Sequence, residues 1–415
     1  MASNGAGSLG QGSTSTQIGD FNERVVLSSL RRLGPASKAD LARRIGLTSN
    51  AAGVIVRKLE ETGLVRTAGK RYGGRGQPAT VLELNPEGAY AVGVRIDRDM
   101  IETVLVDLAG TVIERVVIDG LPMPEDAIAA LASHVRGFRR RLGPKSSARL
   151  SGLGVAMPYN LGSWLGNLDL PDAVFRRWDA FDLQPALTQA TGLAVVVEND
   201  GSAAAVGELL HGHGRELDDF LYLFIGPAVG GGVVLGGNYL RGRNANAGDM
   251  AVVPVGPSRL ASAPPGDGRA QPLIARASLA VLARHLRHNG VRVRSTLDLD
   301  DAIDAAPKAF AEWIDDAADA MAWPILTGAH ILDVQHVIVA GDLPHEHLEP
   351  LVARLAERCA ACVAESRQAP EIRVGAVGRD AGAVGAASLP VHVSYSPMRE
   401  LLTGDTPDAF MEVLS

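Results

Sequence analysis

An adjacent amide and carboxylate, Asn199 and Asp200, are the residues best suited to chemistry in this chain of 415 residues. They follow an apolar stretch at 194–197 that has the composition of a buried strand. A carboxylate at such a strand end can act as a general base toward a hydroxyl, or can accept a hydrogen bond from one. In a purely structural alternative, Asp200 only caps the helix expected at 201–210.

Two similar groups of strands are expected to position this pair. The first group lies at 92–96, 103–107, 112–118 and 152–157, with an amphipathic helix at 124–142. The second has strands at 220–225 and 233–236 around a glycine-rich turn, and a buried strand at 336–340. This order is that of an α/β protein, and the repetition predicts two lobes with a ligand cleft between them.

Charge is distributed unevenly along the chain. Residues 21–83 contain 12 Lys and Arg against 5 Asp and Glu, a balance of +7, whereas residues 84–415 contain 28 against 41, a balance of −13. A compact basic segment beside an acidic body favours contact between the basic end and a polyanion, because neutralised phosphates release counterions. A basic face that serves only solubility is the alternative on charge alone.

The basic segment has the spacing of a helix-turn-helix. Helices are expected at 22–32, at 38–45 with Ser37 as N-cap, and from Thr48 or Ser49 to about residue 62. Six apolar residues are expected to close a small core: Leu41, Ile45, Leu47, Val54, Ile55 and Leu59. The third helix then presents Ser49, Asn50, Arg57 and Lys58 to DNA, with Asn50 alone suited to reading adenine.

A basic, glycine-rich segment at 70–78 follows and is expected to form a wing between two short strands. Arg75 is suited to insertion into a narrow minor groove, and Pro78 keeps the backbone extended. A flexible interdomain linker is the alternative. The expected DNA contacts are Ser37, Thr48, Ser49, Asn50, Arg57, Lys58, Lys70, Arg71, Arg75 and Gln77.

Composition limits the class of protein further. With 46% apolar and 21% charged residues, the chain is expected to form two or three globular domains. No apolar run is long enough to span a membrane, and residues 1–17, an expected disordered tail, lack the pattern of a signal peptide. We therefore expect a cytoplasmic protein without membrane contact. Cys359 and Cys362 cannot build a disulfide framework or a four-thiolate metal site, and their helix is expected to face the core.

Six short motifs occur along the chain in a distinctive order. They are Arg75-Gly76-Gln77-Pro78-Ala79-Thr80, Val106-Asp107-Leu108-Ala109-Gly110, Glu198-Asn199-Asp200-Gly201, Gly230-Gly231-Gly232, Asn246-Ala247-Gly248-Asp249 and Asp380-Ala381-Gly382-Ala383-Val384-Gly385-Ala386-Ala387. This set resembles the ROK family, which joins repressors and sugar kinases on a two-lobed actin/hexokinase-like fold. The resemblance runs from about residue 17 to residue 388 and includes the winged helix-turn-helix of the repressor branch, which the kinase branch lacks.

The resemblance implies an α/β architecture with a defined division of the chain. A winged helix-turn-helix DNA-binding domain is expected at 18–84, and a ROK ligand-sensing domain at 85–390 with its lobe boundary near 196. A C-terminal tail is expected at 391–415. Asn199, Asp200 and Asp249 match family residues that hold sugar hydroxyls, although Asp249 is one methylene shorter than the family glutamate.

The chain departs from the kinase branch at the phosphate-binding hairpin. Kinases of the family read roughly G-I-D-I-G-G-T there, whereas this chain has Gly93-Val94-Arg95-Ile96-Asp97-Arg98-Asp99. Two carboxylates, Asp97 and Asp99, are expected to repel a polyphosphate, and Pro227 removes an amide from the second hairpin. We therefore expect no use of ATP, no enzyme activity and no catalytic residue, with Asp200 a relic of the family's base.

Two further departures concern zinc and the sugar pocket. Val252 stands where the family has a zinc-bound histidine, and the loop 258–272 has no cysteine, so neither a metal nor another cofactor is expected. Val252 and Ile274 also replace two polar sugar contacts, which predicts weak binding of a standard hexose. The segment from Tyr159 to Trp178, with Trp164, Phe175 and Trp178, either supplies an aromatic wall instead or belongs to the core.

These expectations combine into a DNA-binding transcriptional regulator, a repressor, with a catalytically inactive body that senses a sugar or another small ligand. The expected partners are double-stranded DNA at a palindromic operator, the small-molecule effector, and further copies of the chain in a homodimer or homotetramer. Two alternatives stay open: an active, ATP-dependent ROK sugar kinase, and a ligand-independent DNA-binding dimer.

Overall fold

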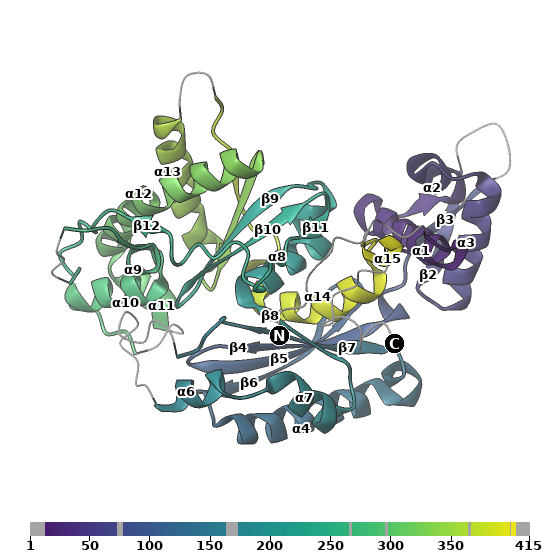
Figure 1. Cartoon of the computed structure of the whole chain (residues 1–415), viewed down its shortest axis with the longest axis horizontal. Helices are drawn as coiled ribbons and strands as arrows, with labels where there is room; N and C mark the ends of the chain where they lie inside the picture. Colours follow the sequence, from purple (N-terminus) through teal and green to yellow (C-terminus); the bar gives the residue numbers. More distant parts are fainter. Residues whose placement is uncertain are drawn as a thin grey trace, which may run out of the picture.

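The computed structural model describes residues 13–72, 78–162, 173–264, 268–294, 298–363, 367–398 and 400–403. A small N-terminal domain is docked at one end of a two-lobed body (Figure 1). The N-terminal domain consists of α1 (Ser15–Leu33), β1 (Ala36–Ser37), α2 (Lys38–Ile45), α3 (Ser49–Glu61), β2 (Val65–Arg71) and β3 (Ala79–Leu84). Its three strands form one antiparallel sheet in the order β1-β3-β2, which is a winged helix-turn-helix.

Side-chain caps fix where the helices of this domain begin. Ser37 forms a capping box with Asp40 at the start of α2, and Thr48 accepts a hydrogen bond from the Ala51 amide at the start of α3. Both caps confirm the sequence prediction. Gly46, in the left-handed conformation, ends α2 and sets the turn between the two helices.

The first helix is longer than the sequence predicted. Thr14 and Gln17 form a capping box that starts α1 at Ser15, so residues 15–17 are helical and the expected tail at 1–17 is too long. Residues 1–12, the rest of that tail, lie outside the described part of the chain. The centre of the expected wing, residues 73–77, lies outside it as well.

The core of the domain differs from its prediction at two positions, because Leu47 is only half-buried and does not belong to the core cluster, and Val54 is exposed. Leu41 and Leu59 are buried as expected, but Val54 is 59% exposed. Val56, on the opposite face of α3, is fully buried in its place. The exposed Val54 therefore belongs to the outer face of α3, beside Asn50 one turn earlier.

The first lobe is built on a five-stranded sheet. Its elements are η1 (Pro86–Gly88), β4 (Tyr90–Ile96), β5 (Met100–Asp107), β6 (Val112–Asp119), α4 (Pro124–Ser147), β7 (Leu150–Met157), α6 (Ala173–Asp179), α7 (Leu183–Thr191) and β8 (Val195–Asn199). The strand order is β6-β5-β4-β7-β8, with an antiparallel hairpin followed by parallel strands. Helices α4 and α7 cover its outer face (Figure 1).

The second lobe repeats this arrangement. Its elements are β9 (Phe220–Ile225), β10 (Val229–Leu235), β11 (Asn238–Tyr239), β12 (Pro254–Val255), β13 (Gln271–Pro272), α9 (Ile274–Ala277), α10 (Leu279–His288), α11 (Leu299–Ala305), α12 (Pro307–Leu332), β14 (His336–Gly341), α13 (His345–Cys362) and β15 (Glu371–Val374). The order β11-β10-β9-β14-β15 has the same hairpin-led pattern as the first sheet. The predicted duplication is thereby confirmed. Since β8 belongs to the first sheet, that lobe ends at Asn199 rather than near 196.

Two helices lie between the sheets: α8 (Asp200–His211) and α14 (Ala381–Tyr395). Small residues allow a very close approach there. A Cβ atom on Gly154 of β7 would stand 1.8 Å from the Ala386 carbonyl oxygen, and one on Gly93 of β4 would stand 2.2 Å from that of Ala383. The expected C-terminal tail at 391–415 begins too early, because Val391 and Val393 are buried in α14.

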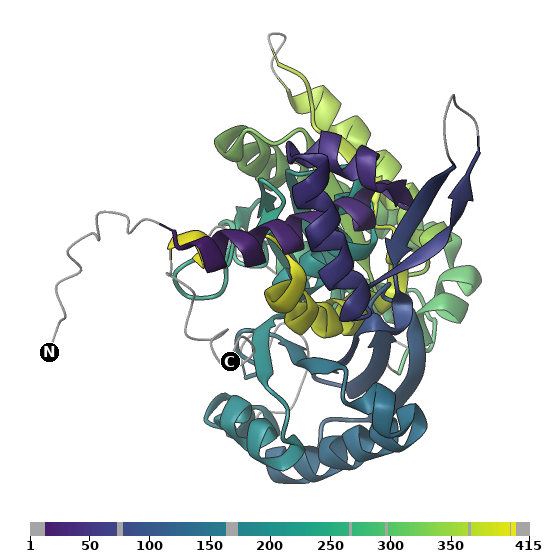
Figure 2. The same ribbon diagram turned by 90° about the vertical axis from the view of Figure 1, so that its right-hand side faces the viewer.

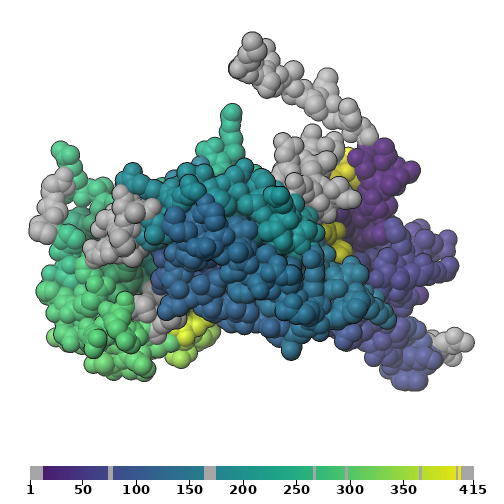
Figure 3. Space-filling model, turned by 90° about the horizontal axis from the view of Figure 1, so that it is seen from below, coloured from purple at the N-terminus to yellow at the C-terminus, as the bar shows by residue number. Residues whose placement is uncertain are grey.

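The N-terminal domain contacts the body mainly through α1. Arg24 Nη1 donates to the carbonyl oxygens of Val393 and Ser396 at 2.7 and 3.3 Å, and Arg32 pairs with Asp218 at 2.5 Å. Helix α1 lies beside the short α15 (Glu400–Thr403), as Figure 2 shows. In the space-filling view the N-terminal domain and the second lobe occupy opposite ends of the molecule (Figure 3). No described helix is both long and apolar enough to cross a membrane.

Candidate functional site

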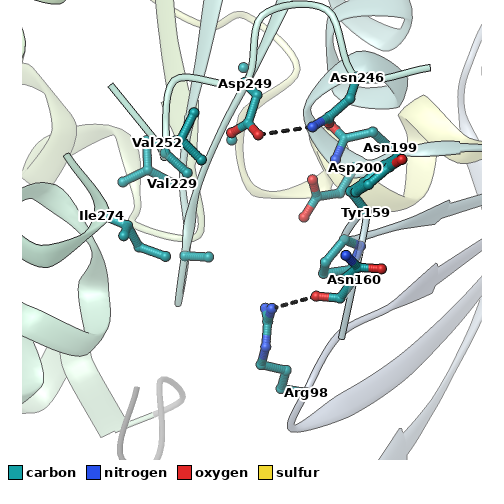
Figure 4. Close-up of a pocket in the computed structure, with 15 residues that line it drawn as sticks. Arg98, Tyr159, Asn160, Asn199, Asp200, Val229, Asn246, Asp249, Val252 and Ile274 are labelled. Atoms are coloured by element: carbon teal, nitrogen blue, oxygen red, sulfur yellow. Dashed lines mark hydrogen bonds between the residues drawn. The ribbon is translucent and has the colours of Figure 1, made fainter. Parts of the chain in front are cut away.

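A cleft of about 400 Å³ lies between the two lobes and brings together the three residues predicted to bind a ligand, Asn199, Asp200 and Asp249. One wall is polar and the other apolar (Figure 4). The lining residues are Arg98, Pro158, Tyr159, Asn160, Asn199, Asp200, Ala228, Val229, Gly230, Gly231, Asn246, Asp249, Ala251, Val252 and Ile274. The mixture suits a ligand that carries both hydroxyls and carbon faces.

Asn199, and not Asp200, is the N-cap of α8. Its Oδ1 atom accepts hydrogen bonds from the Gly201 and Ser202 amides at 3.0 and 3.4 Å. The alternative in which Asp200 only caps the helix is thereby weakened, because Asp200 stands at the first helical position and lines the cleft. Within the described part of the chain, its Oδ1 atom accepts from the Gly201 amide alone, at 2.8 Å. The cap holds the strand end and the carboxylate in fixed positions.

The environment of Asp200 makes its proton affinity unusual. Burial, followed by the nearby charge of Asp97, raises the pKa of Asp200 to about 6, while Arg95 and Arg98 oppose the rise. A carboxyl with this pKa exchanges its proton close to neutral pH. Asp200 can therefore accept a hydrogen bond or a proton from a ligand hydroxyl.

The wall opposite Asn199 and Asp200 is mainly apolar. Val252, 47% exposed, and Ile274, buried, face the polar wall as the sequence predicted (Figure 4). Asp249 Oδ2 accepts from Asn246 Nδ2 at 2.8 Å, so the amide orients this carboxylate at the rim. Arg98, Tyr159, Asn160 and Asn246 were not predicted as lining residues. Asn246 belongs to a quoted motif, Arg98 to the quoted first hairpin, and Tyr159 to the segment considered as an aromatic wall, whereas Asn160 carried no signal of its own.

The aromatic residues near the cleft divide between wall and core. Phe175 and Trp178 are buried in the core of the first lobe, and Trp178 Nε1 donates to the Pro122 carbonyl oxygen at 2.9 Å. Trp164 lies outside the described residues. Tyr159, 58% exposed, is the aromatic residue that lines the cleft.

A buried ion pair joins the lobes at the first hairpin. Arg95 of β4 contacts both carboxylate oxygens of Asp342, which follows β14, at 2.6 and 2.7 Å. The guanidinium also reaches Asp97 at 3.0 Å and lies 5.2 Å from the centre of the Phe224 ring. The pKa of Arg95 stays above its ordinary value despite burial, chiefly because of Asp342. This cluster holds the first lobe against the second.

The same cluster changes the reason for expecting no nucleotide. The sequence predicted that free carboxylates at 97 and 99 repel a polyphosphate, but Asp97 is paired with Arg95. Its other oxygen accepts from the Arg98 amide at 2.8 Å, and the Gly226 amide donates to the Ala228 carbonyl in the second hairpin. Backbone amides of both hairpins are thus already bonded within the protein. The expectation of a free, repelling carboxylate is therefore wrong for Asp97.

The predicted DNA contacts of the helices lie mostly on one exposed face. Thr48, Ser49, Asn50 and Arg57 are exposed on α3 or its cap. Ser37 differs, since its side chain is 4% exposed and its hydroxyl donates to Asp40 Oδ2 at 2.7 Å. Its role is therefore to cap α2.

Two basic residues of the predicted interface, Lys58 and Arg71, pair with acidic neighbours. Lys58 pairs with Glu23 of α1 at 2.5 Å, and Arg71 pairs with Asp40 at 2.7 Å. Lys70 is exposed on β2. The predicted contacts Arg75 and Gln77 lie outside the described residues.

Sequence reasoning missed three exposed residues beside this face. Val54 lies one helical turn after Asn50, where an apolar side chain can contact a thymine methyl group. Arg43 and Arg44 are exposed at the end of α2, where they can contact DNA phosphates. The sequence analysis expected Val54 and Ile55 in the core, and the apolar run at 54–56 does not by itself show which of its members face inward.

Metal binding finds no support in the described side chains. No group of three or more His, Cys, Asp or Glu among them could hold a metal ion. Cys359 is buried in the core of the second lobe, as predicted, and burial raises the pKa of its thiol to about 12. The buried, protonated thiol of Cys359 therefore serves to pack the core of the second lobe.

The fold and the cleft define a winged helix-turn-helix protein with a two-lobed body of the sugar-kinase type. The sequence model of the ROK family matches residues 91–392, which is most of the chain. This protein therefore belongs to the ROK family. A second model, described as winged helix-turn-helix DNA-binding, matches residues 22–66.

Similar proteins include both regulators and kinases. The DNA-binding transcriptional repressor Mlc of Escherichia coli is 30% identical over 252 residues, 58% of each chain. The glucokinase of Halalkalibacterium halodurans is 27% identical over 71% of this chain and 93% of that enzyme. The crystal structure of a ROK family transcriptional regulator, a homolog of the E. coli MLC protein, has a TM-score of 0.64 at 21% identity. The match covers 96% of this chain and 99% of the chain of that regulator, so the two proteins share the fold along nearly their whole length.

Proposed function

We propose that this protein is a sugar-responsive transcriptional repressor that works in the cytoplasm. The observation that carries the proposal is the exposed face of α3, with Asn50 and Arg57, on a winged helix-turn-helix docked to a ROK body. Asn50 would read adenine in the major groove, and Lys70 with Arg71 would contact phosphates. The remaining predicted contacts in the wing, Arg75 and Gln77, extend the same basic edge in sequence.

The operator is proposed to be a palindrome bound by two copies of the chain. A winged helix-turn-helix of this size presents one reading helix, and one helix covers too few base pairs to select a site in a genome. Two heads related by a twofold axis read two equal half-sites. We therefore propose a homodimer or homotetramer.

The effector is proposed to be a sugar or a similar polyhydroxylated molecule in the interlobe cleft. Asn199, Asp200 and Asp249 supply acceptors and an amide donor for its hydroxyls, and Val229, Val252 and Ile274 supply an apolar face. A binding pocket that has polar groups on one side orients the ligand, while the apolar side tolerates variation. Affinity for a standard hexose should be modest because the apolar wall leaves hydroxyls unpaired.

We propose that α14 transmits the effect of ligand binding to the DNA-binding domain. This helix lies between the two sheets, and its end receives two hydrogen bonds from Arg24 of α1. A ligand that binds a closed arrangement of the lobes more tightly than an open one would shift α14 and with it the docked head. The alternative of a ligand-independent dimer predicts no such coupling.

We further propose that the body is not an enzyme. Arg95 and Asp342 fill the position between the hairpins where the kinase branch holds phosphates, and both hairpins use amides internally. One observation favours the rival function of a sugar kinase: Asp200 occupies the position of the family base, with a pKa of about 6. ATP-dependent phosphorylation of a hexose or N-acetylhexosamine by the purified protein would decide for the kinase.

DNA binding is tested by footprinting on the region upstream of the protein's own transcription unit. We expect a protected, twofold-symmetric site at moderate salt, weakened by Arg57→Gln. The control is Arg136→Gln, which removes one exposed positive charge from α4 in the body. The absence of sequence-selective protection by the wild-type protein would overturn the proposal.

Ligand sensing is tested by thermal unfolding in the presence of a panel of sugars. A ligand at 100 times its dissociation constant adds about 2.7 kcal/mol of stability. We expect at least one sugar to stabilise the wild-type protein, and Asp249→Asn to reduce the effect. If no sugar acts while operator binding is intact, the proposal of a sugar effector is overturned.

A further inference from the structure

A second cavity, of about 150 Å³, lies where the N-terminal domain meets the body. It is separate from the interlobe cleft and shares none of its lining residues. Its walls come from the end of α1, the following turn, the end of β3, and two segments of the body. The lining residues are Leu30, Arg31, Gly34, Pro35, Glu83, Leu84, Leu108, Ala109, His211 and Arg215.

Arg31 is the unusual residue of this cavity. It is 5% exposed, and its Nε and Nη2 atoms are buried without a hydrogen-bond partner. No carboxylate of the described residues forms an ion pair with it. A permanently charged guanidinium that is buried and unpaired is strongly unfavourable, so such a group normally has a counter-charge.

The surroundings of Arg31 add positive charge. Arg215 also lines the cavity, is exposed at the surface, and lowers the pKa of Arg31 together with burial. Burial and these two arginines lower the pKa of His211 to about 3, so the imidazole is neutral. Glu83 is the single acidic residue among the lining side chains, and its carboxylate pairs with Arg66 at 2.7 Å. The described side chains therefore leave a net positive cavity.

The size of the cavity restricts the counter-charge to something small. Its volume is about five times the share of one water molecule in the liquid. A tetrahedral oxyanion fits inside, whereas a whole phosphorylated sugar fits only if its organic part projects past Arg215 at the mouth. A phosphate of duplex DNA cannot follow Arg31 into a buried position.

We propose that this cavity binds a small oxyanion, inorganic phosphate or the phosphate group of a monoester, between Arg31 and Arg215. Guanidinium groups form strong, charge-assisted hydrogen bonds to phosphate oxygens. Because Arg31 belongs to α1 and Arg215 to the body, the bound anion holds the DNA-binding domain against the body. It adds to the Arg32–Asp218 ion pair one residue further along α1.

The test is thermal unfolding of the full chain in chloride buffer, with sodium phosphate or sodium sulfate added at constant ionic strength. Wild-type protein is expected to unfold at a higher midpoint as either oxyanion is added, with saturation in the millimolar range or below. Arg31→Met is expected to unfold at a higher midpoint than wild type in chloride alone, since it removes the unpaired charge, and to lose the response.

Arg215→Gln and Arg136→Gln complete the set. Arg215 is exposed, so its substitution should leave folding intact and weaken phosphate binding about 10- to 100-fold, the effect of one charge-assisted hydrogen bond. Arg136→Gln, on the surface of α4, should respond like wild type. A wild-type protein indifferent to both oxyanions, or an Arg31→Met variant with an unchanged response, would overturn the proposal.

A third arm identifies the source of the phosphate. Glucose 6-phosphate is compared with inorganic phosphate in the Asp249→Asn background, where the interlobe cleft is impaired. Tighter binding of the ester indicates a phosphorylated metabolite, and tighter binding of inorganic phosphate indicates the free ion. The response supports the site when Arg31→Met in the same background removes it, and a response that survives Arg31→Met would contradict the site.

Discussion

Replacement of Asp200 by Asn should stabilise the protein, and by an amount that depends on pH. The substitution keeps the shape of the side chain and the oxygen that accepts from the Gly201 amide. It removes a charge whose formation burial and Asp97 oppose. In the wild-type protein that opposition raises the carboxyl pKa from 3.8 to about 6.

The sign follows from proton linkage. Between about pH 4 and pH 6 the folded protein keeps a proton on Asp200 that the unfolded chain has already released. The stability of the wild type therefore falls as pH rises through this window, and the loss is complete above the folded pKa. For a raised pKa of this size, ionisation of Asp200 lowers the free energy of unfolding by about 3 kcal/mol at pH 8 and by about 1 kcal/mol at pH 4.5.

Urea unfolding of both proteins from pH 4.5 to pH 8 measures the difference. We expect Asp200→Asn to be the more stable variant, with a gap that widens toward pH 8. The control Asp301→Asn removes an exposed carboxylate of α11 and should change stability by less than about 0.5 kcal/mol at each pH. A gap that is constant, or that narrows as pH rises, would refute the account of Asp200. The same variant should lose response to the effector, which makes Asp200 a residue kept for function at a cost in stability.

Three further results are expected. Asp342→Ala should destabilise the protein by about 3 kcal/mol in denaturant unfolding, because buried Arg95 loses its bidentate partner. Adding Arg95→Met should recover part of the lost stability. A double variant that is less stable than the single variant would contradict the pairing. Gly154→Ala should cost about 3 kcal/mol or more and lower the thermal midpoint, since its Cβ would overlap a backbone carbonyl of α14; a normal midpoint would show that α14 is displaced easily. In gel-shift titrations, Asn50→Ala should weaken the free energy of operator binding by about 1–3 kcal/mol and change binding to random DNA little. Lys70→Ala should weaken binding to both DNAs and reduce the slope of log affinity against log salt concentration by about 1. Equal losses of affinity for Asn50→Ala on both DNAs would contradict its role in reading a base.

Much of the local structure could be predicted from the sequence because short-range chemistry determines it. Ser37 and Thr48 cap helices through contacts three residues away, so the pattern of polar and apolar residues is sufficient. The hairpin-led repeat is also a local pattern, and it implied two lobes. The convergence of Asn199 and Asp249 followed from the family resemblance rather than from spacing.

Long-range partners could not be predicted in this way. Arg95 and Asp342 are 247 positions apart, and nothing near either residue indicates the other. The sequence therefore showed charged residues in the first hairpin without showing that they neutralise each other. The end of the body was placed too early because the last family motif ends at Ala387, and no pattern in the sequence marks the burial of the residues that follow it. In the structure Pro390 lies within α14 and packs over Gly152 of β7, and that burial outweighs the lost backbone hydrogen bond.

The position of α14 has a consequence for synthesis of the protein on the ribosome. Strands β4 and β7 are translated early, yet their glycines pack against residues 383–390, which emerge near the end of the chain. The first lobe cannot reach its final packing while its last helix is still in the exit tunnel, whereas the head, whose buried core lies within residues 26–82, can form that core earlier. A nascent chain paused before residue 381 therefore carries a folded DNA-binding domain beside an incompletely packed body. Truncation there should leave the head able to fold while the body aggregates.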